Sequence, residues 1–152
     1  MKIEFNIIEI PKLTGKSYEI DSYTEGTITF SCKSESLETL EGILLVEFAM
    51  ALSSWLNDSN DVDMYYESQD FEESPLILFH RDNLNKFVVT SALVEGELKV
   101  NEEDLISGSK KFIQELQENL MANHSIDISG HISQGQEHGR FHLPPEIRNR
   151  RD

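Results

Sequence analysis

The chain has 152 residues, of which 38% are hydrophobic and 27% charged, and its formal net charge is -15. This length suits one domain with a single hydrophobic core, and the charge repels nucleic-acid phosphates and anionic membranes, so we expect neither as a direct partner. The single cysteine, Cys32, excludes an internal disulfide. The first residues alternate apolar and polar side chains, unlike a signal peptide, and no run approaches the roughly 18 apolar residues of a membrane helix. We expect a cytoplasmic protein that needs no cofactor.

Alternating apolar and polar side chains predict strands in the first part of the chain. The pattern is clear in residues 2–10, which end at Pro11, and in residues 27–32. A further short strand is expected at residues 17–21.

Residues 37–56 are predicted to form the central helix of the fold, with Ser36 as its N-cap. At about 100° per residue, the apolar side chains occupy two sectors that are separated by Glu47, so the helix should be buried on more than one side. The sectors consist of Leu37, Leu40, Leu44, Phe48, Ala51 and Trp55, and of Ile43, Val46 and Met50. Glu47 is expected to bond to a tyrosine or a backbone amide, because buried polar groups are normally paired. A functional carboxylate is the alternative.

Three strands, at residues 62–67, 75–80 and 86–91, are predicted to form an antiparallel meander. A second helix follows Asn101, which can cap it, and its first turn carries three acidic side chains that suit the helix dipole. This order predicts an α+β domain over residues 1–122, in which two helices pack on an antiparallel sheet. Residues 123–152 are polar and predict an irregular C-terminal appendage, whose removal should leave the domain folded.

Residues 58–73 are the most strongly charged segment and contain seven carboxylates but no lysine or arginine. A charge run is commonly a solvated loop, and the alternation of a calcium-binding loop is missing. Crowded carboxylates raise one another's pKa, and a cationic partner relieves that repulsion. With two tyrosines as contact anchors, the candidate partner-binding residues are Asp58, Asp61, Asp63, Tyr65, Tyr66, Glu67, Asp70, Glu72 and Glu73.

The histidines of the appendage suggest an alternative function. They are His124, His131, His138 and His142. A metal-binding protein or an enzyme that uses this tail is possible on residue type alone. The spacings match no familiar metal site, however, and the chain has no phosphate-binding loop or nucleophile elbow. We therefore expect no catalytic residues and no metal ligands.

The order of predicted elements in residues 26–122 resembles that of a known group of proteins. It consists of a β segment, a helix that contains Glu47 and ends in Trp55-Leu56, the run Tyr65-Tyr66-Glu67-Ser68, and the acid-rich stretch 71–79 with its proline-led strand. In this layout the chain resembles small immunity proteins of bacterial polymorphic-toxin and contact-dependent growth inhibition systems. The resemblance implies a cytoplasmic antitoxin, without catalytic residues, that binds a cognate toxin.

The acidic charge favours one kind of toxin. Toxin domains that act on nucleic acid have basic surfaces, and an acidic inhibitor associates with them quickly and selectively. The expected function is to cover the active or substrate-binding surface of a basic, nuclease-type toxin domain. An inhibitor that mimics nucleic acid against a host or phage enzyme is the alternative binding function.

Overall fold

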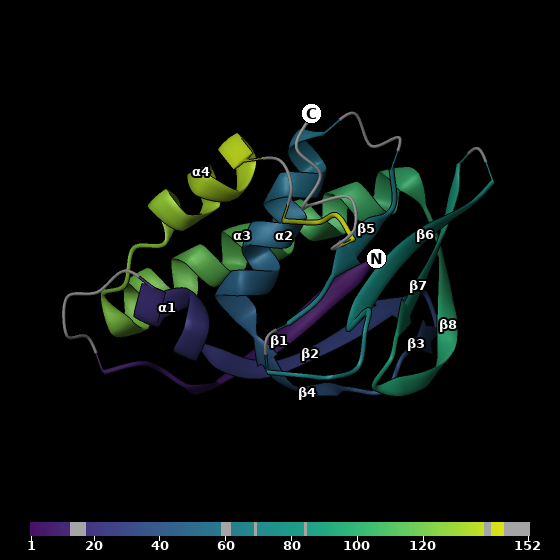
Figure 1. Cartoon of the computed structure of the whole chain (residues 1–152). Helices are drawn as coiled ribbons and strands as arrows, with labels where there is room; N and C mark the ends of the chain where they lie inside the picture. The colour runs from purple at the N-terminus through teal and green to yellow at the C-terminus, as the bar shows by residue number, and fades with distance from the viewer. Residues whose placement is uncertain (13–17, 59–61, 69, 84, 139–140, 145–152) are drawn as a thin grey trace.

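A computed structural model describes residues 1–12, 18–58, 62–68, 70–83, 85–138 and 141–144 of the chain. These residues form two antiparallel sheets and four helices (Figure 1). The predicted α+β class is confirmed. The structure has more sheets and helices than expected: the strands are divided between two sheets, and two additional helices are present.

The first sheet is built around one strand that has partners on both sides. Its strands are β1 (Lys2–Glu9), β2 (Glu25–Cys32), β3 (Glu35–Ser36) and β4 (Leu40–Leu44). Strand β2 pairs with β1 along one side and with β3 and β4 along the other. The alternation read from the sequence reappears in the packing, since Ile28 and Phe30 of β2 are buried in the core.

A short helix, α1 (Tyr18–Tyr23), lies where a strand was expected. The hydroxyl of Thr24 donates to the carbonyl of Ile20 at 2.6 Å, and the amide of Thr24 donates to the same carbonyl. These bonds satisfy a carbonyl that would otherwise be left open at the end of the helix. The strand prediction at residues 17–21 was therefore wrong for the described part of this segment.

The central helix is shorter than predicted. Helix α2 spans Leu45–Asn57, while Ser36, the expected N-cap, lies in β3, and the expected first turns of the helix form β4. Gly42 has a φ of +73°, a backbone conformation that glycine adopts at little cost but that an α-helix does not contain. Helix α2 begins without a side-chain cap, and the amide of Leu45 instead donates to the carbonyl of Thr24 at 2.9 Å.

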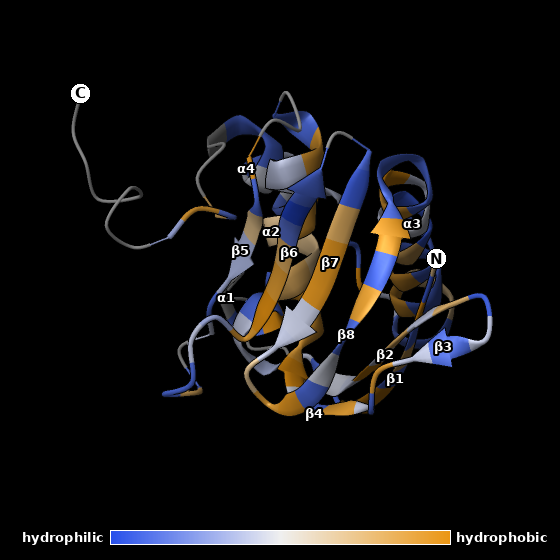
Figure 2. Cartoon of the chain, turned by 90° about the vertical axis from the view of Figure 1, so that its right-hand side faces the viewer, coloured by the Kyte–Doolittle hydropathy of each residue, from blue (hydrophilic) through white to orange (hydrophobic). Residues whose placement is uncertain are grey.

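The second sheet is a four-stranded meander in which each strand pairs with the next. Its strands are β5 (Met64–Tyr66), β6 (Ile77–Asn83), β7 (Lys86–Ser91) and β8 (Val94–Asn101). The first three correspond to the predicted meander, whereas β8 was missed because three exposed residues, 95–97, interrupt its apolar pattern. Figure 2 shows α2 behind this sheet and no described helix in front of it, so the sheet has an outer face.

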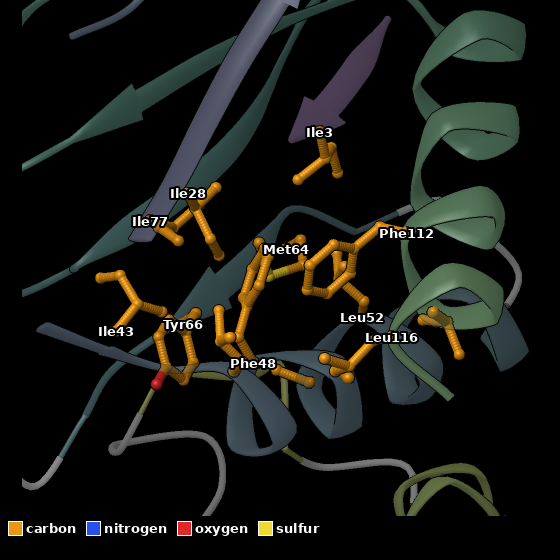
Figure 3. Packing of buried hydrophobic residues seen from close by; sticks show 14 of the residues in the cluster. Ile3, Ile28, Ile43, Phe48, Leu52, Met64, Tyr66, Ile77, Phe112 and Leu116 are labelled. Atoms are coloured by element: carbon orange, nitrogen blue, oxygen red, sulfur yellow. The ribbon is translucent and has the colours of Figure 1, made fainter. Parts of the chain in front are cut away.

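Helix α3 (Glu102–His124) begins as predicted, with Asn101 Oδ1 accepting from the amide of Asp104 at 2.8 Å. The core joins both sheets to α2 and α3 (Figure 3). Aromatic rings connect them: Phe30 of β2 lies 6.2 Å from Phe48 and 6.1 Å from Phe79, between ring centroids. Within the described residues, no helix combines the length and apolar character that crossing a membrane requires.

The described part of the predicted appendage packs against the remainder of the chain. Helix α4 (Ser129–His138) lies along α2 (Figure 1), and the side chains of Ile126, Ile128 and Ile132 are buried in the core. The amide of Tyr65 donates to the carbonyl of His142 at 2.8 Å, which places residues 141–144 beside β5. The division of the chain after residue 122 stays a prediction. Removing the appendage would uncover part of the core, whereas the sequence predicts a domain that stays folded without it.

The contact between α4 and α2 can be tested with two glycines of α4. A Cβ atom at Gly135 would lie 2.6 Å from the carbonyl oxygen of Met50, whereas a Cβ at Gly130 would meet nothing within 4 Å. We expect Gly135→Ala to lower the free energy of unfolding by about 1–3 kcal/mol, as overpacking does. Gly130→Ala is the control and should leave it unchanged or raise it by up to about 1 kcal/mol. Urea unfolding measures both, and equal effects would show that α4 is not closely packed on α2.

Candidate partner-binding site

Of the predicted site residues, Tyr65 and Tyr66 lie on β5, and Glu67, Asp70, Glu72 and Glu73 lie in the acidic loop, residues 67–76, which joins β5 to β6. The amide of Leu76 donates to the carbonyl of Tyr66 at 2.8 Å and holds the two ends of the loop together. In the middle of the loop, the side chain of Phe71 packs on the core. Its ring lies close to Gly42, so that a Cβ atom added to Gly42 would be 3.2 Å from the ring. This apolar anchor holds exposed carboxylates on the adjoining residues. They belong to Asp70, Glu72 and Glu73.

Tyr65 and Glu67 belong to one hydrogen-bonded network. The hydroxyl oxygens of Tyr65 and Ser74 are 2.5 Å apart, and the Ser74 hydroxyl donates to Glu67 Oε2 at 3.0 Å. Because side chains alternate along a strand, Tyr65 points away from the core, to which its neighbours Met64 and Tyr66 point. The structure thus places a phenol and a carboxylate together at the rim of the outer face.

Two of the predicted aspartates have contacts within the chain. Asp63 Oδ2 lies 3.0 Å from His80 Nδ1, and Asp63 Oδ1 accepts from the amide of Arg81 at 3.0 Å. Asp58 Oδ2 lies 3.3 Å from His142 Nε2. Changing either aspartate would therefore disturb the fold as well as the surface charge. Asp61 lies outside the described residues.

Tyr66 is not available as a surface anchor, which corrects our expectation. Its side chain is only 1% exposed, and Figure 3 shows it among apolar residues with its hydroxyl at the margin of the cluster. That hydroxyl donates to Glu47 Oε1 at 2.8 Å. The predicted pairing of Glu47 with a tyrosine is thus confirmed.

Glu47 and Tyr66 also line a pocket of about 250 Å³, which the sequence analysis missed. Its walls come from α1, α2, the end of β5 with the start of the acidic loop, and the C-terminal segment. We call it the acidic pocket, and its lining residues are Asp21, Ser22, Glu47, Met50, Ala51, Tyr66, Glu67, Ser68 and Phe141. No single stretch of sequence reveals a pocket assembled from four distant segments.

The carboxylates of the acidic pocket are held in an unfavourable environment. Burial raises the pKa of Glu47, hydrogen bonds from Tyr66 and Ser68 oppose this increase, and the charge of Asp21 adds to it. Burial also raises the pKa of Asp21, and the charge of His131 and backbone hydrogen bonds from Asp21 and Ser22 oppose this increase. One carboxylate oxygen, Asp21 Oδ1, is buried without a hydrogen-bond partner.

A second buried polar group was also missed. The Ser54 Oγ lies 2.7 Å from His142 Nδ1, and Asp58 Oδ2 lies near the other ring nitrogen. These are the residue types of a hydrolase triad, but Ser54 and His142 are both 0% exposed, so a substrate does not reach the hydroxyl. Burial lowers the pKa of His142, and the nearby charge of Asp58 opposes this effect. The group holds the C-terminal segment against α2.

The other histidines of the tail form no metal-binding group in the part of the chain that the structure describes. His124 is exposed at the end of α3, His131 lies on α4, and the side chain of His138 is outside the described part of the chain. In the described residues, no group of three or more His, Cys, Asp or Glu side chains is placed so that it could hold a metal ion. The metal-binding alternative therefore finds no ligand set among these residues.

A family model described as "Domain of unknown function (DUF7878)" matches residues 3–122. No curated protein and no solved structure matches the chain. The matched range includes the acidic loop, Glu47 and Tyr66, and it ends within α3.

Proposed function

The chain belongs to the DUF7878 family, and we propose that it is an immunity-type inhibitor, which neutralises a basic toxin domain by covering that domain's active or substrate-binding surface. It acts by binding and performs no catalysis. The observation that carries the proposal is the acidic loop: three exposed carboxylates are anchored by Phe71 beside the Tyr65–Ser74–Glu67 network.

Two contacts hold described parts of the loop against the fold. The amide of Leu76 donates to the carbonyl of Tyr66, and Phe71 packs on the core. Contacts that exist before binding lower the entropy cost of binding a partner. Negative charge on an exposed, fixed surface attracts a basic partner and orients it during encounter.

The outer face of the second sheet adds apolar area next to this charge. Tyr65 is opposite Leu78 in the pairing of β5 with β6, and Leu78 is opposite Thr90 of β7. All three side chains are partly exposed. An apolar centre with a polar rim is the usual anatomy of a protein–protein interface, and this face and the acidic loop together form the proposed contact area.

The proposal is tested in two steps, of which the first identifies the partner. The tagged protein is used as bait in a lysate of the native organism at low salt, and bound proteins are released at high salt. The catalytic domain of a captured basic protein is then expressed with and without this chain in a bacterial host. We expect the domain alone to stop growth and the chain to restore it. A captured host or phage regulator that is not toxic would instead favour the nucleic-acid-mimicking inhibitor.

The second step is a charge test on the identified pair. The triple variant Asp70→Asn, Glu72→Gln and Glu73→Gln removes only exposed charge, and we expect it to weaken binding at low salt at least about tenfold, or about 1.4 kcal/mol. The matched control removes three exposed charges elsewhere, from β1 and α3: Glu4→Gln, Glu9→Gln and Glu118→Gln. Titration calorimetry at two salt concentrations measures both. Equal losses in the two variants would mean that overall charge, and not the acidic loop, drives binding.

A further inference from the structure

We propose that residues 141–144 form a latch that opens locally when His142 is protonated, while the two sheets and α4 stay folded. The latch goes beyond the proposed function, because its opening does not require a partner. It depends on one histidine that fixes the segment to α2 and to β5 at the same time. A change of charge on that single ring therefore acts on both attachments.

The attachments of the latch converge on His142. Its carbonyl accepts from the Tyr65 amide at 2.8 Å, its Nδ1 lies 2.7 Å from Ser54 Oγ, and its Nε2 lies 3.3 Å from Asp58 Oδ2. The residue is 0% exposed, so these contacts form where water is excluded. Because the main-chain bond and the ring contacts belong to the same residue, we expect them to be lost together.

The site is suited to a neutral ring and not to a charged one. Burial lowers the pKa of His142 more than the proximity of Asp58 raises it. Asp58 faces the ring from the end of α2, but its side chain is 39% exposed, so water screens its charge. From β5, His142 meets the main chain of Tyr65, whose phenol points to the outer face. A charge that forms on the buried ring costs free energy, which is recovered when the segment moves into water.

The other titratable groups near the latch surround Phe141, in the acidic pocket. They are Asp21 of α1, Glu47 of α2, Tyr66 of β5 and Glu67 of the acidic loop. Burial raises the pKa of Asp21 and of Glu47, so their protonation favours the folded arrangement. Protonation of His142 has the opposite effect, which makes this residue the trigger.

Opening can stop at the end of α4, because that helix has attachments of its own. Ser53 Oγ donates to the carbonyl of Ile132 at 3.3 Å, and Asn57 Nδ2 donates to the carbonyl of Gln136 at 3.0 Å. The side chain of Ile132 is also buried in the core. Helix α4 therefore stays on α2 when the latch leaves, and opening requires less free energy than global unfolding.

The latch borders the proposed contact area. Its opening frees the amide of Tyr65, a candidate partner-binding residue, and removes the wall that Phe141 gives to the acidic pocket. Main-chain groups at the edge of a strand can pair with an incoming strand. An open latch therefore offers a partner a different surface from a closed one.

Hydrogen exchange of three amides in the full-length protein tests the latch. The Tyr65 amide reports the latch itself. The Leu76 amide, which donates to the Tyr66 carbonyl, reports the connection from β5 to β6, and the Ile132 amide reports α4. We expect the protection factor of Tyr65, corrected for the intrinsic effect of pH on exchange, to fall by up to about tenfold per pH unit below about 6.5. The protection factors of Leu76 and Ile132 should not fall with it.

Variants identify the trigger. His142→Leu removes the titrating ring, so the protection factor of Tyr65 should no longer depend on pH in this range. Asp58→Asn removes the carboxylate that favours the protonated ring, so the fall should extend to lower pH. Glu72→Gln makes the same charge change on an exposed residue of the acidic loop and should leave the profile unchanged.

Three outcomes would overturn the proposal. A Tyr65 protection factor that does not fall on acidification would show that the latch stays closed. A parallel fall for Tyr65, Leu76 and Ile132 would show that the chain opens as a whole. An unchanged profile in both His142→Leu and Asp58→Asn would show that another group controls the segment.

Discussion

A chain that ends at His124 is expected to lose cooperative unfolding. The truncation removes α4 and the buried side chains of Ile126, Ile128 and Ile132, and it uncovers the side of α2 on which Ser53 Oγ donates to the Ile132 carbonyl at 3.3 Å. Burial of one isoleucine side chain stabilises a fold by about 1.5–3 kcal/mol. Three such residues therefore approach the roughly 5–15 kcal/mol that separates folded from unfolded domains.

Urea titration of the truncated chain, followed by circular dichroism and by the fluorescence of Trp55, measures this effect. Trp55 is fully buried in the intact protein, so a solvated emission spectrum without denaturant indicates loss of the core. Residues 125–152 supplied as a separate peptide should restore part of the native signal, which distinguishes missing contacts from damaged protein. A truncated chain that unfolds cooperatively at the original urea midpoint would show that residues 1–122 are a self-sufficient domain, as the sequence first indicated.

The second large effect is expected on acidification. His142 is fully buried, and burial lowers its pKa below the ordinary value of 6.5. The unfolded chain then binds a proton at a higher pH than the folded chain. Stability is therefore complete above about 6.5 and falls as the pH drops from that value toward the lowered pKa of the folded state, at up to about 1.4 kcal/mol per pH unit.

Substitution of this histidine checks the assignment. His142→Leu should remove the pH dependence in that range and lower the free energy of unfolding at neutral pH by about 1–3 kcal/mol, because the Ser54 hydroxyl loses its partner. His124→Gln, at an exposed position, is the control and should keep the pH dependence. Urea unfolding across a pH series gives both quantities. A pH profile that is the same in His142→Leu and in the unmodified chain would contradict the prediction.

The raised pKa values of Asp21 and Glu47 act in the opposite direction at lower pH. These carboxyls bind a proton more readily in the folded state than in the unfolded state. Their contribution is fully present below their ordinary values of 3.8 and 4.5 and is lost as the pH rises through the raised values. The two effects have opposite signs, and the His142→Leu variant shows the carboxyl effect alone in the same pH series.

Local signals in the sequence predicted the elements that depend on neighbouring residues. The capping of α3 by Asn101, the first three strands of the meander and the tyrosine partner of Glu47 all follow from spacing, turn chemistry or the need to pair a buried carboxylate. The alternation of inward and outward side chains along β5 would also have distinguished Tyr65 from Tyr66, had Met64 been recognised as a core residue.

Other features depend on contacts between distant parts of the chain. The apolar spacing of residues 37–44 fits a helix as well as a strand, and pairing with β2 decided between them. Ser54 and His142 are 88 residues apart in sequence, and the acidic pocket joins segments from α1 to Phe141. No local sequence pattern predicts these contacts, because they form only when distant segments pack together in the fold.

The hydrogen bond from the Tyr65 amide to the His142 carbonyl has a consequence for solubility. Strand β5 pairs with β6 along one side, and its other side would present open main-chain groups, which are a template for edge-to-edge aggregation. The segment around His142 occupies part of that side. A residue far along the chain thus helps to protect the sheet from polymerisation, and conditions that displace the segment should first be visible as self-association.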